Sequence, residues 1–281
     1  MQKVWFVTGS NRGLGRNFVE AALARGDKVA ATARSTAALK ELTDTYGDAI
    51  LPLELDVTDR AAVFATVKQA KEHFGRLDVI VNNAGYAQIG AVEELTEREL
   101  RDQLETNLFG AVWVVQAALP YLREQRSGHI VQLSSAAGII AMPLGGAYHA
   151  SKWALEGLNE ALAGEVAEFG VKLTMIEPAG FATRDGNNPD PLANGHMATT
   201  DPAYDAVRQR LGAIAGKMPA GDPAAAAQAL LKLVDSANPP VRVLFGKGFY
   251  PMIQQAYAAR LKTWEDWQDL SIEAHGTHDA R

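Results

Sequence analysis

Residues 3–26 read KVWFVTGSNRGLGRNFVEAALARG and divide into three parts. The first, KVWFVTG, is a nearly continuous apolar run, which is typical of a β-strand buried on both faces. A turn with Gly9, Gly13 and Gly15 follows, and the remainder predicts a helix that ends at Gly26. A glycine turn between a strand and a helix can cradle a phosphate, because backbone amides and the helix dipole both favour an anion there. The stretch therefore predicts a dinucleotide-binding fold; the alternative is an ordinary tight turn.

Strands and helices alternate along the rest of the chain, without a linker or an internal repeat. Further strand-like runs are DKVAATAR, ILPLELD, LDVIVNNAG, GHIVQLSS, VKLTMIEP and PVRVLFG, with helical patterns between them. This order predicts an α/β fold of the doubly wound Rossmann type, with seven parallel strands and helices on both faces of the sheet. We expect one domain over residues 1–248, including a substrate-binding loop at about 181–216.

Residues 249–281 are expected to add a helical extension to the same domain. Ile253, Tyr257, Leu261 and Trp264 recur at helical spacing and form an apolar stripe. Such a stripe packs on the body of the protein or on a partner subunit.

The composition limits the possible classes of protein. The chain has 281 residues, 47% of them hydrophobic, a net charge of -6 and no cysteine. The length suits one large domain, and the lack of cysteine excludes disulfides and thiolate metal sites and suits a reducing cytoplasm. The sequence has no cluster of basic residues that would indicate nucleic-acid binding. Its histidines are too scattered to predict a metal site. The most apolar run, GAVWVVQAALPYL, is too short to span a bilayer, and a strand begins too early to leave room for a signal peptide.

Residues 134–152, SSAAGIIAMPLGGAYHASK, carry the candidate catalytic groups. Tyr148 and Lys152 are four residues apart at the start of a predicted helix, so their side chains lie on one face. An ammonium about 4 Å from a phenol, at an effective dielectric of about 20, would lower the phenol's pKa by about three units. Ser135 ends a strand, and the glycines after it allow the loop to fold back, so that both hydroxyls can meet over one substrate oxygen. The spacing of Tyr148 and Lys152 alone would also fit a surface pair.

The end of the second predicted strand bears on the choice of cofactor. Folds that use NAD commonly place an acid there, for the 2′-hydroxyl of the ribose. This chain instead has Ala33 followed by Arg34, and Arg12 lies inside the glycine turn. A guanidinium suits a phosphate, so we expect NADP(H) rather than NAD. Alternatively, Arg34 is a solvated residue at a strand end and Arg12 stacks on the adenine.

Six features occur together and in register over about residues 3–245: TGSNRGLG, NNAG, Asn107, Ser135, Tyr148-x-x-x-Lys152 and the segment from Pro178 to Thr183. In combination they resemble the short-chain dehydrogenase/reductase superfamily. The chain looks most similar to the branch that includes hydroxysteroid and retinol dehydrogenases. The resemblance implies an oxidoreductase, a carbonyl reductase that is reversible as an alcohol dehydrogenase, and the two arginines make NADP its expected cofactor. It also implies a homodimer or homotetramer paired through helices at about 99–121 and 148–168, and the lack of cysteine makes the cytoplasm the expected location.

The resemblance implies a role for each matching residue. Tyr148 would exchange a proton with the substrate oxygen, which Ser135 would bind, and Lys152 would hold the nicotinamide ribose and lower the pKa of the tyrosine. Asn107 would hold a water in a proton relay, although spacing alone fits an asparagine bonded to nearby backbone. The implied cofactor-binding residues are Gly9, Asn11, Arg12, Gly13, Leu14, Gly15, Arg34, Asp56, Val57, Asn83, Ala84, Gly85, Tyr148, Lys152, Pro178, Gly180 and Thr183. One departure is Pro178-Ala179-Gly180, where the family usually has Pro-Gly.

The substrate and two other classes of function stay open. Apolar side chains expected beside the site favour an apolar or aromatic ketone or secondary alcohol, unless they belong to the core: Tyr86, Ile139, Ile140, Met142, Leu144 and Phe181. A cofactor-sensing regulatory protein of the same fold tends to lose the tyrosine or lysine, and both are present. A sugar-nucleotide epimerase or dehydratase usually has a different glycine spacing and a larger C-terminal region.

Overall fold

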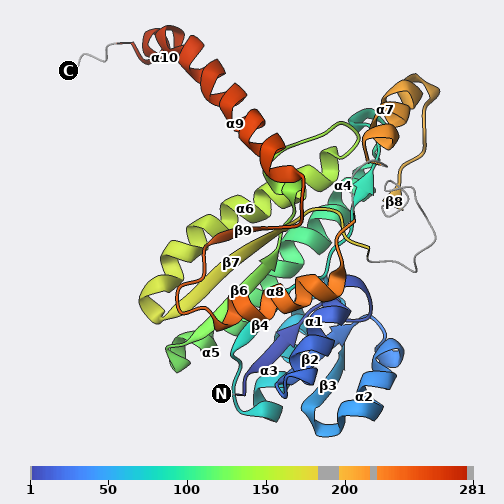
Figure 1. The fold of residues 1–281 in the computed structure, drawn as a ribbon, viewed down its shortest axis with the longest axis vertical. Helices are drawn as coiled ribbons and strands as arrows, with labels where there is room; N and C mark the ends of the chain where they lie inside the picture. The colour runs from blue at the N-terminus through green and yellow to red at the C-terminus, as the bar shows by residue number, and fades with distance from the viewer. Residues whose placement is uncertain (1, 183–195, 216–219, 277–281) are drawn as a thin grey trace.

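The computed structural model describes residues 2–182, 196–215 and 220–276 (Figure 1). A seven-stranded parallel sheet forms its centre, in the order β3-β2-β1-β4-β6-β7-β9. The strands are β1 (Val4–Val7), β2 (Lys28–Ala33), β3 (Ile50–Glu54), β4 (Val79–Asn82), β6 (Gly128–Leu133), β7 (Val171–Pro178) and β9 (Arg242–Phe245). The strand order reverses between β1 and β4, so a crevice opens at the carboxyl ends of the strands at this point. The predicted fold class and the seven parallel strands are confirmed.

Helices cover both faces of the sheet (Figure 1). On one face lie α1 (Gly13–Ala24), α2 (Lys40–Tyr46) and α8 (Pro223–Asp235), and on the other α3 (Arg60–Phe74), α5 (Gly110–Gln125) and α6 (Gly146–Val166). Each face has its own apolar core because successive strand residues point to opposite sides. In β1, Phe6 joins the α3–α5–α6 side and Trp5 the α1–α8 side, and both are fully buried.

The helix predicted from about residue 96 to 121 is interrupted by one π-helical turn. Thr96 caps α4 (Glu97–Leu104) through a reciprocal pair of bonds with Glu99, of 3.2 Å from the Glu99 amide and 2.8 Å to the Glu99 carboxylate. The π turn (Glu105–Phe109) then leads into α5. π turns inside α-helices are frequent at functional sites. Here the turn contains the buried Asn107.

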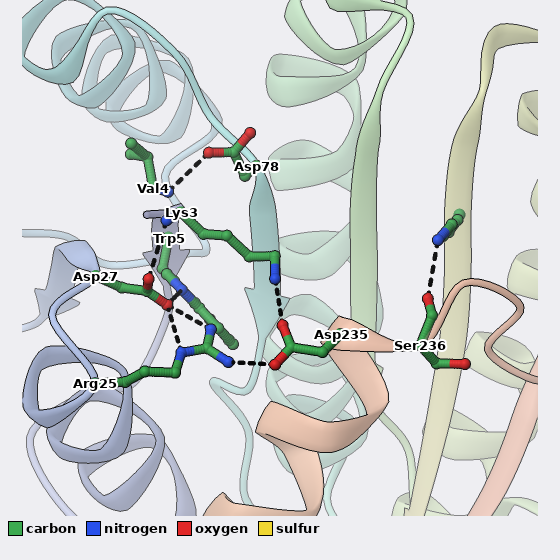
Figure 2. Close-up of polar contacts among 9 residues, drawn as sticks. Lys3, Val4, Trp5, Arg25, Asp27, Asp78, Asp235 and Ser236 are labelled. Carbon is green, nitrogen blue, oxygen red and sulfur yellow. Dashed lines mark hydrogen bonds and ion pairs between the residues drawn. The ribbon is translucent and has the colours of Figure 1, made fainter. Parts of the chain in front are cut away.

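The amino end of β1 is fixed between α1 and α8 by a polar cluster (Figure 2). The buried Asp27 accepts hydrogen bonds from the Lys3 backbone amide at 3.0 Å and from the Trp5 indole at 2.8 Å. Arg25 bridges Asp27 at 3.0 Å and Asp235, at the end of α8, at 2.9 Å, and Lys3 also pairs with Asp235. These contacts set the direction in which β1 runs toward the crevice.

The described parts of the predicted substrate loop contact residues 88–94, which follow β4. The small strands β5 (Gln88–Ile89) and β8 (His196–Met197) pair in parallel, and α7 (Asp205–Ala215) follows. The Glu94 carboxylate accepts the Asp201 amide at 2.6 Å and pairs with Arg208. The described residues also form short 3₁₀ turns: Thr36–Leu39, Gly47–Ala49, Val92–Glu94, Ala136–Gly138, Ala167–Phe169 and Pro202–Tyr204.

The C-terminal residues form α9 (Phe249–Asp266) and α10 (Gln268–His275), which extend away from the body (Figure 1). The predicted apolar stripe is therefore helical, and most of it is exposed within the part of the chain that the structure describes. The assignment of this segment to the same domain stays a prediction. Among the described residues, no helix combines the length and the apolar character that crossing a membrane requires.

Candidate active site

A cavity of about 1150 Å³ lies at the carboxyl ends of the six strands from β3 to β7 in the sheet order. Its wall contains most of the predicted cofactor-binding residues: Gly9, Asn11, Arg12, Gly13, Leu14, Arg34, Asp56, Val57, Asn83, Ala84, Gly85, Tyr148, Lys152 and Pro178. The predicted Ser135 lies on the same wall. Gly15 and Gly180 are not part of the wall, and Thr183 lies outside the described residues.

The glycine turn after β1 is locked to the end of β4. Gly9 and Gly13 adopt φ of 67° and 60°, a conformation that side chains disfavour. A β-carbon on Gly15 would lie 2.3 Å from Asn83 Nδ2 and 2.4 Å from the Gly9 carbonyl oxygen. Asn83 Nδ2 donates to the Thr8 and Gly9 carbonyls at 2.9 and 3.0 Å. Gly15 therefore acts behind the cavity wall, by letting α1 approach the strand end.

The turn and its surroundings fit the phosphates of a dinucleotide. In the described chain no side chain caps the amino end of α1, so the amides of its first turn remain for an anion. Arg12 and Arg34 are exposed on the cavity wall, and no other described residue forms an ion pair with either. The nearby Asp56 is engaged differently, because its Oδ1 accepts the Thr58 amide at 3.0 Å and the Thr58 hydroxyl at 2.8 Å.

Ser135 and Tyr148 both lie on the wall of the cavity. Ser135 follows β6, and its Oγ accepts the Ala137 amide at 3.1 Å, which fixes the hydroxyl at the start of a 3₁₀ turn. Burial raises the pKa of the Tyr148 phenol, and a hydrogen bond with Ser135 opposes part of this rise. The phenol therefore keeps its proton at neutral pH and is a potential proton donor.

The pKa of Tyr148 is raised overall, whereas the sequence predicted that Lys152 would lower it. The Lys152 Nζ donates to the Leu133 carbonyl at 2.6 Å and lies 5.8 Å from the centroid of the Tyr148 ring. Burial lowers the pKa of Lys152 itself to about 8, against an opposing effect of Glu156. The prediction omitted burial, which disfavours the charged form of each group and is the largest cause of both shifts.

Asn107 is not part of the cavity wall, and its hydrogen bonds connect the segment after β4 with α6. Its Oδ1 accepts the Tyr86 amide at 3.1 Å, and its Nδ2 donates to the Tyr86 carbonyl at 2.9 Å and to Ser151 Oγ at 3.0 Å. A β-carbon on Gly85 would lie 3.0 Å from Asn107 Oδ1 and 3.9 Å from Lys152 Nζ. The asparagine thus bonds to neighbouring backbone, while its carbonyl and the lysine approach the same glycine.

Comparison with known proteins shows to which family this chain belongs. A family model described as short chain dehydrogenase matches residues 3–190. The chain belongs to the short-chain dehydrogenase family.

Relatives match this short-chain dehydrogenase over almost its whole length. Oxidoreductase BOA17 of Botryotinia fuckeliana is 40% identical over 276 residues, which cover 97% of this chain and 99% of the relative. A 3-ketodihydrosphingosine reductase of Bacteroides thetaiotaomicron is 33% identical, over 93% of each chain. The family makes this chain an oxidoreductase that acts on CH–OH or C=O groups.

Solved structures show the same fold. A short-chain dehydrogenase from Streptomyces avermitilis has a TM-score of 0.89 at 38% identity, over 97% of this chain and 98% of that one. An alcohol dehydrogenase from Thermococcus sibiricus, complexed with 5-hydroxy-NADP, has a TM-score of 0.70 at 26% identity, over 87% of this chain and 96% of that one.

In this short-chain dehydrogenase, His149 holds the loop between Ser135 and Tyr148, a contact that the sequence did not predict. Its Nε2 lies 2.9 Å from the Met142 amide and accepts its hydrogen. The ring proton is therefore on Nδ1, which donates to the Ala137 carbonyl at 2.8 Å. A single histidine beside a tyrosine carries no recognisable spacing, so no sequence signal indicated this role.

A cluster of acids around Arg242 lies on α6 and β7, with Glu156 and Glu177 buried and Glu160 exposed, and was also missed. Arg242 pairs with Glu156 and Glu160 of α6 at 3.0 Å each, and approaches Glu177 of β7 at 3.8 Å. Burial and Glu156 raise the pKa of Glu177 to about 7, against an opposing effect of Arg242. Glu156 follows Lys152 by one helical turn, so the two side chains share a helix face. This spacing was the sign in the sequence that an acid lies near the lysine.

The rest of the wall defines the space for a substrate. Tyr86 and Phe181 lie on it as expected, and the Tyr86 ring is 4.6 Å from that of His196. Ile139, Ile140 and Leu144 are instead buried in the core. Lining residues that the sequence did not indicate are Ala33, Leu55, Thr58, Ala87, Arg98, Asp102, Glu105, Thr106, Leu133, Ser134, Ala179 and His196.

Proposed function

We propose that this protein is an NADPH-dependent carbonyl reductase, reversible as an alcohol dehydrogenase, with Tyr148 as the general acid and base. One observation carries the proposal. A single cavity contains the Ser135 and Tyr148 hydroxyls, the Lys152 ammonium, the glycine turn and the exposed Arg12 and Arg34. This combination supplies a proton donor, an oxygen-binding group and an anion site within the same space.

The proton chemistry follows from the arrangement of the side chains. The bound nicotinamide would supply or accept the hydride. During reduction, Ser135 donates a hydrogen bond to the carbonyl oxygen and Tyr148 transfers its proton to that oxygen. The raised pKa of Tyr148 keeps this proton in place until the oxygen becomes basic. Lys152, with a pKa of about 8, is mostly an ammonium at pH 7 and stabilises the tyrosinate that remains.

Arg12 and Arg34 support the choice of NADPH over NADH. Both are exposed on the cavity wall, one from the glycine turn and one from the end of β2. The position after β2 lacks the acid that would bind a ribose 2′-hydroxyl and repel a 2′-phosphate. The NADP derivative in the Thermococcus alcohol dehydrogenase supports this choice.

The lining and one relative support an apolar or aromatic ketone as the substrate. Tyr86 and Phe181 present aromatic surface to the cavity that also contains the two catalytic hydroxyls. The name of the Bacteroides relative, 3-ketodihydrosphingosine reductase, specifies reduction of a ketone. The corresponding secondary alcohol would be the substrate in the reverse direction.

Cofactor preference in the parent and in Arg34→Ala tests the proposal. A charged hydrogen bond contributes about 1.5–3 kcal/mol, so loss of one contact to the 2′-phosphate lowers the NADPH preference by about tenfold or more. The measurement is kcat/KM for NADPH and NADH with a panel of apolar ketones. Lys232→Ala, which removes an exposed cation of α8 outside the cavity wall, is the control and leaves the preference unchanged. A parent that prefers NADH, or an unaltered preference in Arg34→Ala, contradicts this account.

A further inference from the structure

Glu156 of α6 lies next to both parts of the candidate active site. It follows Lys152 by one turn of the helix, so the two side chains share a face, and both residues are buried. A β-carbon added to Gly138 would lie 2.9 Å from Glu156 Cγ and 3.2 Å from the Lys152 carbonyl oxygen. The same β-carbon would lie 2.8 Å from Oγ of Ser134, the neighbour of Ser135. Glu156 is therefore packed between the loop that carries Ser135 and the helical turn that carries Lys152.

Arg242 of β9 compensates the charge of this buried carboxylate. Its Nε donates to Glu156 Oε2 at 3.0 Å, whereas Oε1 accepts no hydrogen bond from the residues that the structure describes. Arg242 also pairs with the exposed Glu160 at 3.0 Å and approaches the buried Glu177 at 3.8 Å. A buried carboxylate stays ionised where a cation compensates it. The pair with Arg242 therefore maintains a negative charge one helical turn from Lys152.

Lys152 occupies a position that disfavours its own charge. Burial lowers its pKa to about 8, and Glu156 opposes this shift. The acceptor of its Nζ, the Leu133 carbonyl, is uncharged. Without a nearby anion, more of this lysine would be neutral at the pH at which the enzyme works.

We propose that Glu156, with Arg242 as its counter-ion, is a positioning residue that keeps Lys152 in its ammonium form. The inference rests on the proposed function, in which this ammonium stabilises the tyrosinate of Tyr148. Charges in buried surroundings act over several ångströms, so the carboxylate need not touch the ammonium. Glu156 thus acts on the proton transfer through Lys152 and not through the substrate.

The other groups around Lys152 do not replace the charge of Glu156. On α6, Tyr148 keeps its proton, because burial raises its pKa. Glu177 of β7 becomes an anion as the pH rises through about 7, but it faces Arg242 and Glu156. The neighbours from β6, the segment after β4 and the π turn are uncharged: the Leu133 carbonyl, Gly85 and Asn107.

The test is the pH dependence of kcat/KM for ketone reduction by the full chain. In the parent, activity should fall as the pH rises through about 8, where Lys152 loses its proton. Glu156→Gln removes the charge, keeps the size of the side chain, and should move this midpoint to lower pH by at least about half a unit. Glu156→Asp retains the charge and should restore most of the parent's midpoint.

Glu160→Gln is the matched control. It removes the other carboxylate that pairs with Arg242 at 3.0 Å, but it lies two helical turns from Lys152 and its side chain is 67% exposed. A purely structural ion pair would lower the melting temperature of a variant without moving its midpoint. The double variant Glu156→Gln, Arg242→Gln leaves neither member of the pair uncompensated, and its midpoint should also move to lower pH.

The outcomes separate this inference from the proposed function. The parent's midpoint in both Glu156→Gln and the double variant, or an equal shift in Glu160→Gln, overturns the role of Glu156 and leaves the proposed function in place. A parent that reduces no ketone with either cofactor contradicts the proposed function, and this inference with it.

Discussion

Gly15→Ala tests the contact between the glycine turn and the end of β4. The new β-carbon would lie 2.3 Å from Asn83 Nδ2 and 2.4 Å from the Gly9 carbonyl oxygen, closer than such contacts occur. Asn83 cannot simply rotate away, because its Nδ2 holds the carbonyls of Thr8 and Gly9. The turn must therefore move, and with it the amides at the start of α1.

The expected cost follows from these contacts. Two hydrogen bonds contribute about 1 kcal/mol each, and overpacking of a tight site costs about 1–3 kcal/mol. Alanine offsets about 0.4–1 kcal/mol by reducing the entropy of the unfolded chain. We expect a net loss of about 2 kcal/mol, and a melting temperature at least about 4 °C lower. Displacement of the phosphate cradle should weaken NADPH binding by about tenfold or more.

Thermal unfolding and a fluorescence titration with NADPH measure the two effects of Gly15→Ala. The matched control is Gly157→Ala, an exposed glycine of α6 whose added β-carbon would meet nothing within 4 Å. This control should be stabilised by about 0.5–1 kcal/mol and should bind NADPH as the parent does. A Gly15→Ala variant with the parent's melting temperature and NADPH affinity would refute the reasoning.

Two further predictions concern the polar clusters away from the turn. Glu177 has a folded pKa raised to about 7, so its protonated form stabilises the fold at acid pH, and this contribution is lost as the pH rises through about 7. Glu177→Gln should therefore gain stability over the parent at pH 8 and little at pH 5 in urea unfolding; an equal effect at both pH values would count against the shift. Asp27→Ala removes the acceptor of the Lys3 amide and the Trp5 indole (Figure 2) and should cost about 2–4 kcal/mol, whereas Asp48→Ala, at an exposed turn, should cost less than about 0.5 kcal/mol. Equal stabilities of these two variants would contradict the role of Asp27.

Local patterns were sufficient to predict the sheet and the position of most site residues. Continuous apolar runs identify the buried parallel strands, and the carboxyl ends of such strands meet at one edge. For this reason the glycine turn, the end of β4 and the Ser135 loop reach the same cavity as predicted. Tyr148 and Lys152 share a helix face because their spacing is local.

Features that depend on tertiary contacts were not predicted. Arg242 meets Glu156 across 86 residues of sequence, and no local pattern relates them. The π turn around Asn107 coincides with bonds to Tyr86, which is 21 residues earlier. The pKa of Tyr148 rises because of burial, whereas the sequence indicated only the nearby charge. The same limit applies to α9, because its apolar stripe was predicted from the sequence but the exposure of that stripe was not.

Tyr148→Phe tests the central claim most directly. The measurement is kcat/KM for NADPH-dependent reduction of the best ketone in the panel, together with the NADPH dissociation constant. General acid catalysis contributes about 10²–10⁴-fold, so the variant should lose at least about a hundredfold in kcat/KM while it binds NADPH as the parent does. Tyr86→Phe, on the same cavity wall, is the matched control and should stay within a few-fold of the parent. Activity of Tyr148→Phe within tenfold of the parent would contradict the account.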